Sequence, residues 1–360
     1  VVARKGNLRQ VAHLTNNFTS EGPLSQGVRE AISAALEHGW SDPKKLSQAS
    51  HRAQALRTQS IEEMAQILQL SPAAIEVTGE PHLLHLLAVK GFLDTDRHLF
   101  TSTIDVGKIR AIARAHTGPT SQMEVDSRGA ISMPSEISLD SVISLQAENG
   151  ETGIHQNLDM WRSLPAQVVL DATHTVPDSK LTEGFACATF DAQSWNGPSG
   201  LGFLVINDGD RYRYPLAHIA PIRVPGSYSL PLLVGAVIAL NEYREKKEQI
   251  DKVRNLLAEQ LRTVDGLTVI GEGIQSSRYL SAIVEGVSGE EVLRALLKIG
   301  IATDSGSACS PEDLAPSHVI GAMGFPTTGH LRFTIHPETL PAESENLVEK
   351  VKGTLQTLRS

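Results

Sequence analysis

The sequence predicts a two-lobed α/β protein whose larger lobe is built on a mainly parallel β-sheet. Three observations support this prediction. Helical segments alternate with short apolar runs along much of the chain, as in parallel sheets that are covered on both faces. A long helical region begins near Ser229 and changes from apolar to strongly charged. The last part of the chain interleaves strand-like runs with two amphipathic helices, as in a compact α+β unit.

Composition is that of a globular protein. The 360 residues are enough for a sizeable core. No apolar run approaches the roughly 20 residues that a membrane span needs, and the first residues lack the apolar core of a signal peptide. The net charge of -9, without a long basic run, argues against a nucleic-acid groove. Cys187 and Cys309 lack zinc-ligand spacing and cannot form a disulfide framework, so we expect a cytoplasmic location. The thirteen histidines show no His-x-x-x-His pair backed by a carboxylate, so we expect no metal site.

The first predicted elements are two amphipathic helices. Residues 27–39 have helical periodicity and end at Gly39. In residues 60–70, Ser60 followed by Glu63 has the pattern of a capping box, so we expect a helix to begin at Ser60. Buried strands separated by helices are then predicted within residues 98–103, 142–146, 167–173, 186–192 and 200–208.

The long helical region that starts near Ser229 is expected to leave the core of the larger lobe and to bridge to the smaller one. Beyond it, strands are predicted within residues 267–271, 279–287 and 330–336, and helices at 288–300 and 343–358. We place the larger lobe at residues 15–245. The smaller lobe combines residues 1–14 with residues 246–360.

A cysteine in the stretch SGSACS is the sharpest local signal. Cys309 is flanked by Gly, Ser and Ala, which predicts an open loop in which a thiolate can act as a nucleophile. On this hexapeptide alone, a small residue in a tight turn explains the pattern equally well.

Three further side chains end or lie on predicted strands. Asp171 follows the apolar run QVVL and so lies where open α/β sheets bind ligands, although helix caps and turns also use aspartate. Glu151 follows the strand predicted at residues 142–146, and it either shares this geometry or belongs to a polar loop. Arg332 alternates with apolar neighbours and could clamp a carboxylate or form a surface ion pair.

Taken together, these segments resemble the cysteine desulfurase family, class V aminotransferase-like enzymes that use pyridoxal phosphate. The resemblance covers nearly the whole chain in the order LTNNFTS, ENGETG, LDATHTV, NGPSGLGFL, and GIATDSGSACSPEDLAPSHVIGAMGF followed by LRFTIH. It implies an aspartate-aminotransferase-like fold of type I, with a mainly parallel seven-stranded sheet and a small α+β C-terminal domain. It also implies a homodimer with sites at the subunit interface.

The resemblance assigns a role to each matching residue. Asp171 would pair with the pyridine nitrogen, and His174 stands where the family has a glutamine. The implied catalytic residues are Cys309 and His174, the implied substrate-binding residues are Arg332 and Asn17, and the implied cofactor-binding residues are Asp171, Glu151, Asn149, Gln193, Ser194 and Ser227.

The chain departs from the family pattern at the cofactor lysine. The pattern Ser-x-His-Lys-x-x-Gly-Pro is here DAQSWNGP, which puts Gln193 in place of the histidine and Ser194 in place of the lysine. Serine cannot form an imine with the cofactor. Lys180 is the nearest alternative lysine in the sequence, and we expect it at the far end of the following strand.

Other departures fall around the same site. Pro81 has no N–H to offer in the segment that matches the phosphate turn. The family's stacking histidine falls near Val106, and the second asparagine of its Asn-Asn-Glu loop is Gly150. In the segment that matches Arg-x-Gly-Thr, only Ser227 keeps a hydroxyl that could reach a neighbouring subunit's phosphate.

We therefore expect pyridoxal phosphate to be absent or weakly bound, because charge-assisted hydrogen bonds contribute ~1.5–3 kcal/mol each and several are missing. The expected function is sulfur transfer or iron–sulfur assembly without desulfurase activity. The expected partners are a second copy or an active paralogue, and a sulfur-acceptor or iron–sulfur scaffold protein.

Two alternatives stay open. One is an active desulfurase or sulfurtransferase that holds the cofactor non-covalently. The other is an enzyme repurposed for another small amino or carboxylic acid, with acid, base and carboxylate clamp supplied by Asp171, His174, Glu151 and Arg332.

Overall fold

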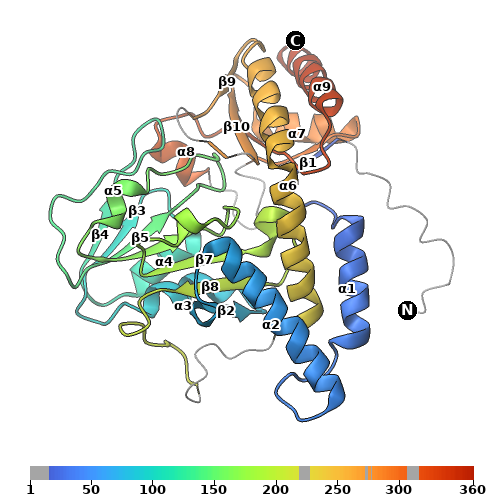
Figure 1. Ribbon diagram of the computed structural model, residues 1–360. Coiled ribbons are helices and arrows are strands. Elements are labelled where there is room, and N and C mark those ends of the chain that lie inside the picture. Colours follow the sequence, from blue (N-terminus) through green and yellow to red (C-terminus); the bar gives the residue numbers. More distant parts are fainter. Residues whose placement is uncertain (1–15, 219–227, 272–274, 277, 306–315) are drawn as a thin grey trace.

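The structure is a computed structural model that describes residues 16–218, 228–271, 275–276, 278–305 and 316–360 (Figure 1). Its main feature is a seven-stranded sheet in the order β2-β8-β7-β6-β5-β3-β4. The neighbouring strands from β7 to β4 are parallel, whereas β8 is antiparallel to both β7 and β2. The predicted α/β class and mainly parallel seven-stranded sheet are confirmed.

Five strands of this sheet coincide with predicted runs, namely β3 (Leu99–Ser102), β5 (Val142–Gln146), β6 (Gln167–Asp171), β7 (Cys187–Asp191) and β8 (Gly202–Ile206). The two outer strands, β2 (Ile75–Thr78) and β4 (Thr120–Met123), have no apolar run that would predict them. In β4 only Met123 is buried, as is common for a strand at the edge of a sheet.

Helices cover both faces of the sheet, and successive residues of one strand face opposite sides. In β6, Val168 and Leu170 belong to the core shared with α2 (Gln48–Leu68) and α6 (Leu230–Leu261). Val169 belongs instead to the core shared with α3 (Leu84–Lys90) and α4 (Gly107–Ala115). Burial on both faces explains why these strands are continuous apolar runs.

The first helices agree in part with expectation. Helix α1 (Gln26–His38) ends at Gly39 as predicted. The prediction that a helix begins at Ser60 is wrong, because α2 begins much earlier, after Ser47, whose side chain accepts the N–H of Ser50. Ser60 lies inside α2 and donates its hydroxyl to the carbonyl of Leu56 at 2.9 Å. The preceding residues are rich in Ala, Arg, Gln and Leu, which favour helix and so extend it past the predicted start.

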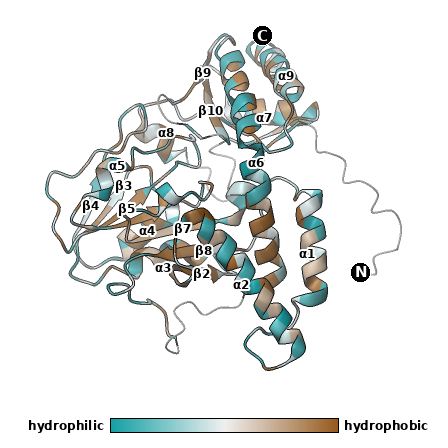
Figure 2. Ribbon diagram, viewed as in Figure 1, coloured by the Kyte–Doolittle hydropathy of each residue, from teal (hydrophilic) through white to brown (hydrophobic). Residues whose placement is uncertain are grey.

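Helix α6 connects the large sheet to a second, smaller unit. It packs against α1 and α2 along one part and against α9 (Pro341–Arg359) along another (Figure 1). Figure 2 shows its change from mainly hydrophobic to mainly hydrophilic residues along its length. The predicted lobe boundary at residue 245 falls within this continuous helix, and the division into lobes stays a prediction.

The smaller unit contains an antiparallel sheet in the order β12-β10-β9 and a two-stranded parallel sheet of β1 and β11. Its elements are β1 (Asn17–Phe18), β9 (Leu267–Val269), β10 (Tyr279–Val284), α7 (Gly289–Lys298), β11 (Ala302–Thr303), α8 (His318–Ala322) and β12 (His330–Thr334). The short helix α5 (Asp159–Arg162) belongs to the larger unit. Within the described ranges, no helix is both long and apolar enough to cross a bilayer.

Candidate functional site

The candidate site lies at one edge of the large sheet, where the parallel strands end. Asp171 is the last residue of β6, Asp105 follows β3, and Asn149 follows β5. Because the carboxyl ends of parallel strands meet at one edge, these polar side chains gather there. We call this group the sheet-edge cluster.

Asp171 is paired with a histidine that sequence reasoning missed. Nε2 of His85, on α3, lies 3.0 Å from Oδ2 of Asp171, and the two side chains are only 7% and 4% exposed. The other carboxylate oxygen, Oδ1, accepts the backbone N–H and the hydroxyl of Thr173 at 3.0 and 2.6 Å. Both oxygens of Asp171 are therefore engaged by groups of this chain.

The His85–Asp171 pair favours the charged form of both partners. Burial alone would raise the pKa of Asp171, but His85 beside it holds that pKa well below its ordinary value. Burial opposes protonation of His85, yet the Asp171 carboxylate raises the pKa of His85 above its ordinary value. The pair thus places an ionised Asp171 beside a histidine whose pKa is raised, while Nδ1 of His85 has no hydrogen-bond partner among the described residues.

A second buried carboxyl group, that of Asp105, lies beside this pair. Burial raises its pKa to about 7, although it accepts the N–H of Ser102 at 2.8 Å. A buried carboxyl group that titrates near neutral pH can act as a general acid or base. Lys108, on α4, lies at the rim of the site, and its Nζ is 2.7 Å from Nδ1 of His82. Burial lowers the pKa of Lys108, whereas the carboxylates of Asp191 and Asp171 oppose this shift.

Ser194, the residue in place of the family lysine, is buried in the 3-10 helix η4 (Ala192–Trp195). Its Oγ lies 3.0 Å from the carbonyl oxygen of Thr175 and 2.8 Å from that of Asp191. Gln193 is exposed, and its carbonyl accepts a hydrogen bond from Arg278. Lys180 lies in η3 (Ser179–Leu181), two residues before Thr182. The carbonyl of Thr182 accepts a hydrogen bond from Asn207, which follows β8 at the opposite end of the sheet.

Asn149 is buried, and its side chain holds its own loop. Oδ1 accepts hydrogen bonds from the N–H groups of Glu151 and Thr152, both at 3.0 Å, and Nδ2 donates to Gln146 at 2.9 Å. Glu151 is half-buried, and its carboxylate accepts a hydrogen bond from the hydroxyl of Ser317. Asn149 therefore braces its own loop, and Ser317, the N-cap residue of α8, joins Glu151 to the smaller unit.

The imidazole ring of His174 packs directly against Gly150. A Cβ atom on Gly150 would lie 2.6 Å from three ring atoms of His174, so the ring occupies the space that a larger residue at position 150 would need. The ring of His174 also contacts Tyr279 edge to face, with centroids 6.2 Å apart. Burial lowers the pKa of His174, which favours the neutral imidazole near pH 7.

Arg332 on β12 is paired with a carboxylate of this chain. Its Nη2 lies 2.7 Å from Oδ2 of Asp304, and its Nη1 donates to the carbonyl of Gly150 at 2.9 Å. Asp304 Oδ2 also accepts the N–H of Ser20 at 2.7 Å. Arg332 is 9% exposed, so this ion pair is buried rather than a surface pair.

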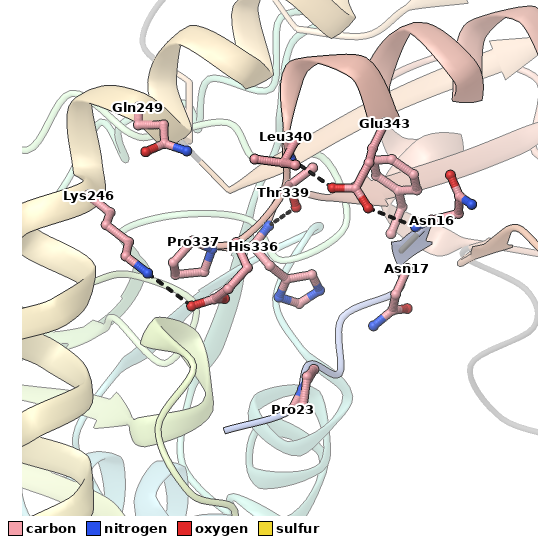
Figure 3. A pocket seen from close by; sticks show the side chains of 12 residues that line it. Asn16, Asn17, Pro23, Lys246, Gln249, His336, Pro337, Thr339, Leu340 and Glu343 are labelled. Carbon is pink, nitrogen blue, oxygen red and sulfur yellow. Dashed lines mark hydrogen bonds and ion pairs between the residues drawn. The ribbon is translucent and has the colours of Figure 1, made fainter. Parts of the chain in front are cut away.

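Asn17 lies on β1 and lines a pocket of about 520 Å³ between β1, α6 and the start of α9 (Figure 3). Its Nδ2 donates to the carbonyl of Glu21 at 2.8 Å and its Oδ1 accepts the hydroxyl of Thr19 at 2.8 Å, so the side chain holds a turn. The polar groups of this pocket are similarly paired with each other: Lys246 with Glu338, and Glu343 with the backbone of Asn16 and Leu340.

Two predicted site residues, Cys309 and Ser227, lie outside the described residues. The structure brings Asp171, His174, Asn149 and Glu151 to the sheet edge, with Arg332 joined to the same loop through Gly150. In the described ranges, no group of three or more His, Cys, Asp and Glu side chains is arranged to hold a metal ion.

Three residues of the site were missed from the sequence. His85 lies in the apolar run LLHLLAV and is more typical of a core histidine. Asp105 follows β3, much as Asp171 ends β6. Looking for carboxylates at the carboxyl end of every predicted strand would therefore have identified Asp105. Asp304 follows β11, but no local pattern links it to Arg332, because only tertiary pairing joins them.

The large sheet is mostly parallel and seven-stranded, with polar groups at its carboxyl edge, and a long helix joins it to a smaller α+β unit. This is the architecture of the pyridoxal-phosphate proteins of fold type I. A solved NifS-like protein matches with a TM-score of 0.83 and 21% identity, over 95% of this chain and 99% of that chain. An apo cysteine desulfurase from Thermococcus onnurineus matches with a TM-score of 0.78 and 16% identity, over 95% of each chain.

Sequence similarity leads to the same family. A cysteine desulfurase of Klebsiella pneumoniae is 27% identical, covering 98% of this chain and 94% of that protein. A cysteine desulfurase of a Nostoc species is 25% identical, covering 97% and 94%. No family model matches the chain. The predicted resemblance to the cysteine desulfurase family is confirmed by these relatives.

Proposed function

We propose that this chain is a cysteine desulfurase-like protein of sulfur transfer or iron–sulfur assembly that has no pyridoxal-phosphate-dependent desulfurase activity of its own. One observation carries the proposal: the groups expected to anchor cofactor and substrate are each engaged by a side chain of this chain, Asp171 by His85 and Arg332 by Asp304. We further propose that the protein is cytoplasmic and works as a dimer, with a second copy or with an active paralogue.

The residues at the sheet edge fit pyridoxal phosphate poorly. Ser194 offers a hydroxyl in place of an amine, and that hydroxyl is held by the backbone. The pyridine N–H would need an oxygen of Asp171, where His85 and Thr173 already supply three donors, so it would compete for the remaining acceptor position of Oδ2. The proposed function therefore includes no reaction step on pyridoxal phosphate.

The substrate end of the site supports the same proposal. A substrate carboxylate would need the guanidinium of Arg332, to which Asp304 already supplies a carboxylate at 2.7 Å. Displacing Asp304 would break an ion pair whose side chains are 11% and 17% exposed, which is costly. Cysteine should therefore bind weakly.

In this proposal the remaining role belongs to Cys309. Its thiolate would attack the terminal sulfur of a persulfide on a donor protein, the sulfur–sulfur bond of the donor would break, and the donor would leave as a thiolate. The product, a persulfide on Cys309, would then pass its outer sulfur to an acceptor protein by the same step. No external oxidant or reductant is needed, because each transfer regenerates one thiolate.

The first test is cofactor content. Purified protein should contain no stoichiometric pyridoxal phosphate, should show no adduct mass when the protein as isolated is treated with borohydride, and should release neither alanine nor sulfide from cysteine when the cofactor is added. A borohydride-trapped adduct, together with these products, would contradict the proposal. Lys108→Met would then show whether the rim lysine had formed the adduct.

The second test is sulfur acceptance. After exposure to a persulfide-loaded desulfurase, the protein should gain the mass of one sulfur atom, and Cys309→Ser should lose this gain. Cys187→Ala is the matched control, because Cys187 is fully buried and burial raises the pKa of its thiol. Equal labelling of the protein and of Cys309→Ser would exclude Cys309 as the carrier.

A second candidate function, an enzyme for another small amino or carboxylic acid, is favoured by one observation. Asp105 has a pKa of about 7 and lies buried beside the His85–Asp171 pair, which is suitable for proton transfer. A thermal-shift screen of small amino and carboxylic acids tests this candidate. Stabilisation that Asp105→Asn abolishes would support it, whereas no stabilisation by any of them would count against it.

A further inference from the structure

A second pocket, of about 530 Å³, lies between the C-terminal part of α6 on one side and Gly271, Gln275 and Ser276 on the other. None of its residues belongs to the sheet-edge cluster. The charged and polar side chains that line it include Asp251, Arg254, Glu259, Arg262, Gln275 and Ser276. We call it the α6 pocket.

The α6 pocket contains a buried arginine whose donors are mostly unused. Arg254 is 6% exposed, and among the described residues its Nε and Nη2 have no hydrogen-bond partner. Its Nη1 donates only a long hydrogen bond, of 3.4 Å, to Oδ1 of Asn255. Buried guanidinium groups are ordinarily paired, so this one requires an explanation.

The acidic residues of the pocket do not neutralise Arg254. Asp251 is instead paired with Lys247 at 2.8 Å, and neither Asp251 nor Glu259 comes within ion-pair distance of Arg254. Burial lowers the pKa of Arg254 to about 10, and the nearby positive charge of Arg262 adds to this effect. The guanidinium therefore remains protonated at neutral pH and lies beside a second cation.

The geometry of the unused donors indicates what they would bind. Nε and Nη2 form one edge of the planar guanidinium, and this edge presents two parallel N–H groups that match a carboxylate or phosphate. The hydroxyl of Ser276 accepts the N–H groups of Arg278 and Tyr279, at 2.9 and 3.2 Å, which leaves its own hydrogen available to an acceptor in the pocket.

We propose that the α6 pocket binds the carboxylate or phosphate group of a small anionic ligand, held by the Nε–Nη2 edge of Arg254. Arg262 adds positive charge at the rim, and Ser276 adds one donor. The ligand supplies the hydrogen-bonded anionic partner that no described residue supplies, since Asp251 acts on Arg254 only at longer range. The proposal is independent of the function proposed above, because the two sites share no residue.

Calorimetric titration of the full chain tests this inference. Inorganic phosphate and succinate are the two probes, with sodium chloride at equal ionic strength as the reference, so that the phosphate and carboxylate sources are distinguished. At least one probe should bind saturably with a one-to-one ratio and raise the Tm by a few degrees. Arg254→Met should weaken binding by at least about ten-fold.

Arg244→Met is the matched control, because Arg244 lies on the same helix, is exposed and does not line the pocket. It should bind like the wild type. Without anion, Arg254→Met should be at least as stable as the wild type, because a buried charge without a partner has been removed. Should Arg254→Met fail to fold, Arg254→Lys is the alternative variant. It keeps the positive charge but lacks the two parallel N–H groups of the guanidinium, so it should also bind about ten-fold more weakly. Equal binding by wild type and either variant, or no binding of either probe, overturns the proposal.

Discussion

Nε2 of His85 lies 3.0 Å from Oδ2 of Asp171, although the two residues are 86 positions apart in the chain. The contact joins α3, which covers one face of the sheet, to the carboxyl end of β6. The carboxylate expected to face a cofactor thus has a histidine of this chain as its partner.

This pair predicts a pH-dependent contribution to stability. The pKa of His85 is raised by Asp171, so the stabilisation is complete below the ordinary histidine value of about 6.5 and is lost as the pH rises through the raised value. His85→Gln should therefore cost about 1–3 kcal/mol at pH 6, and the difference should shrink towards pH 9. Urea unfolding at several pH values measures this. A cost that is the same at pH 6 and pH 9 would exclude the charged pair.

Asp105 predicts a contribution of the opposite kind. Its pKa is raised to about 7 by burial, so ionisation destabilises the folded state as the pH rises from about 4 towards 7. Asp105→Asn keeps an acceptor for the N–H of Ser102 but cannot ionise. It should match the wild type near pH 4 and exceed it by up to about 4 kcal/mol at pH 8. Denaturant unfolding at both pH values checks this, and a variant less stable at pH 8 contradicts it.

Gly150 and His174 should be energetically coupled. Gly150→Ala places a Cβ atom 2.6 Å from the imidazole, so either the ring or the loop must move, at a cost of about 1–3 kcal/mol. In a His174→Ala background the same substitution should cost less than about 0.5 kcal/mol. A double-mutant cycle by urea unfolding gives the coupling. Additive costs would show that the loop, not the ring, resists the alanine.

Restoring the lysine should not by itself restore cofactor binding. Ser194→Lys returns the amine, but His85 still engages Asp171. His85→Leu with Ser194→Lys frees Oδ2, so the double variant should retain covalently bound pyridoxal phosphate at least about ten-fold more tightly than Ser194→Lys alone. Visible absorbance and borohydride trapping report this. Ser199→Lys, at an exposed serine of the same loop, is the control. Equal retention in the single and double variants would show that His85 does not exclude the cofactor.

Much of this architecture could be predicted from the sequence, because buried parallel strands are short apolar runs with sharp ends. The run VISLQ corresponds residue for residue to β5, and Asp171 ends β6 as its position after QVVL predicted. The start of α2 could not be found in the same way, since Ser60 has the local pattern of a cap but lies inside a helix that Ser47 begins.

The partners of the site residues were beyond prediction for a different reason. The contacts of His85 with Asp171 and of Asp304 with Arg332 join segments 86 and 28 residues apart, and no local periodicity records them. Sequence could identify the carboxylate and the guanidinium. Only the fold shows which neighbouring charges they meet.

Helix α6 runs without interruption for 32 residues, or about 48 Å, from the core beneath the large sheet to the smaller unit. Because α1 and α2 pack against one part of this helix and α9 against another, both units rest on a single continuous backbone. The same helix holds Trp195, the sequence neighbour of Ser194, whose indole nitrogen donates to the carbonyl of Ala236 at 2.9 Å.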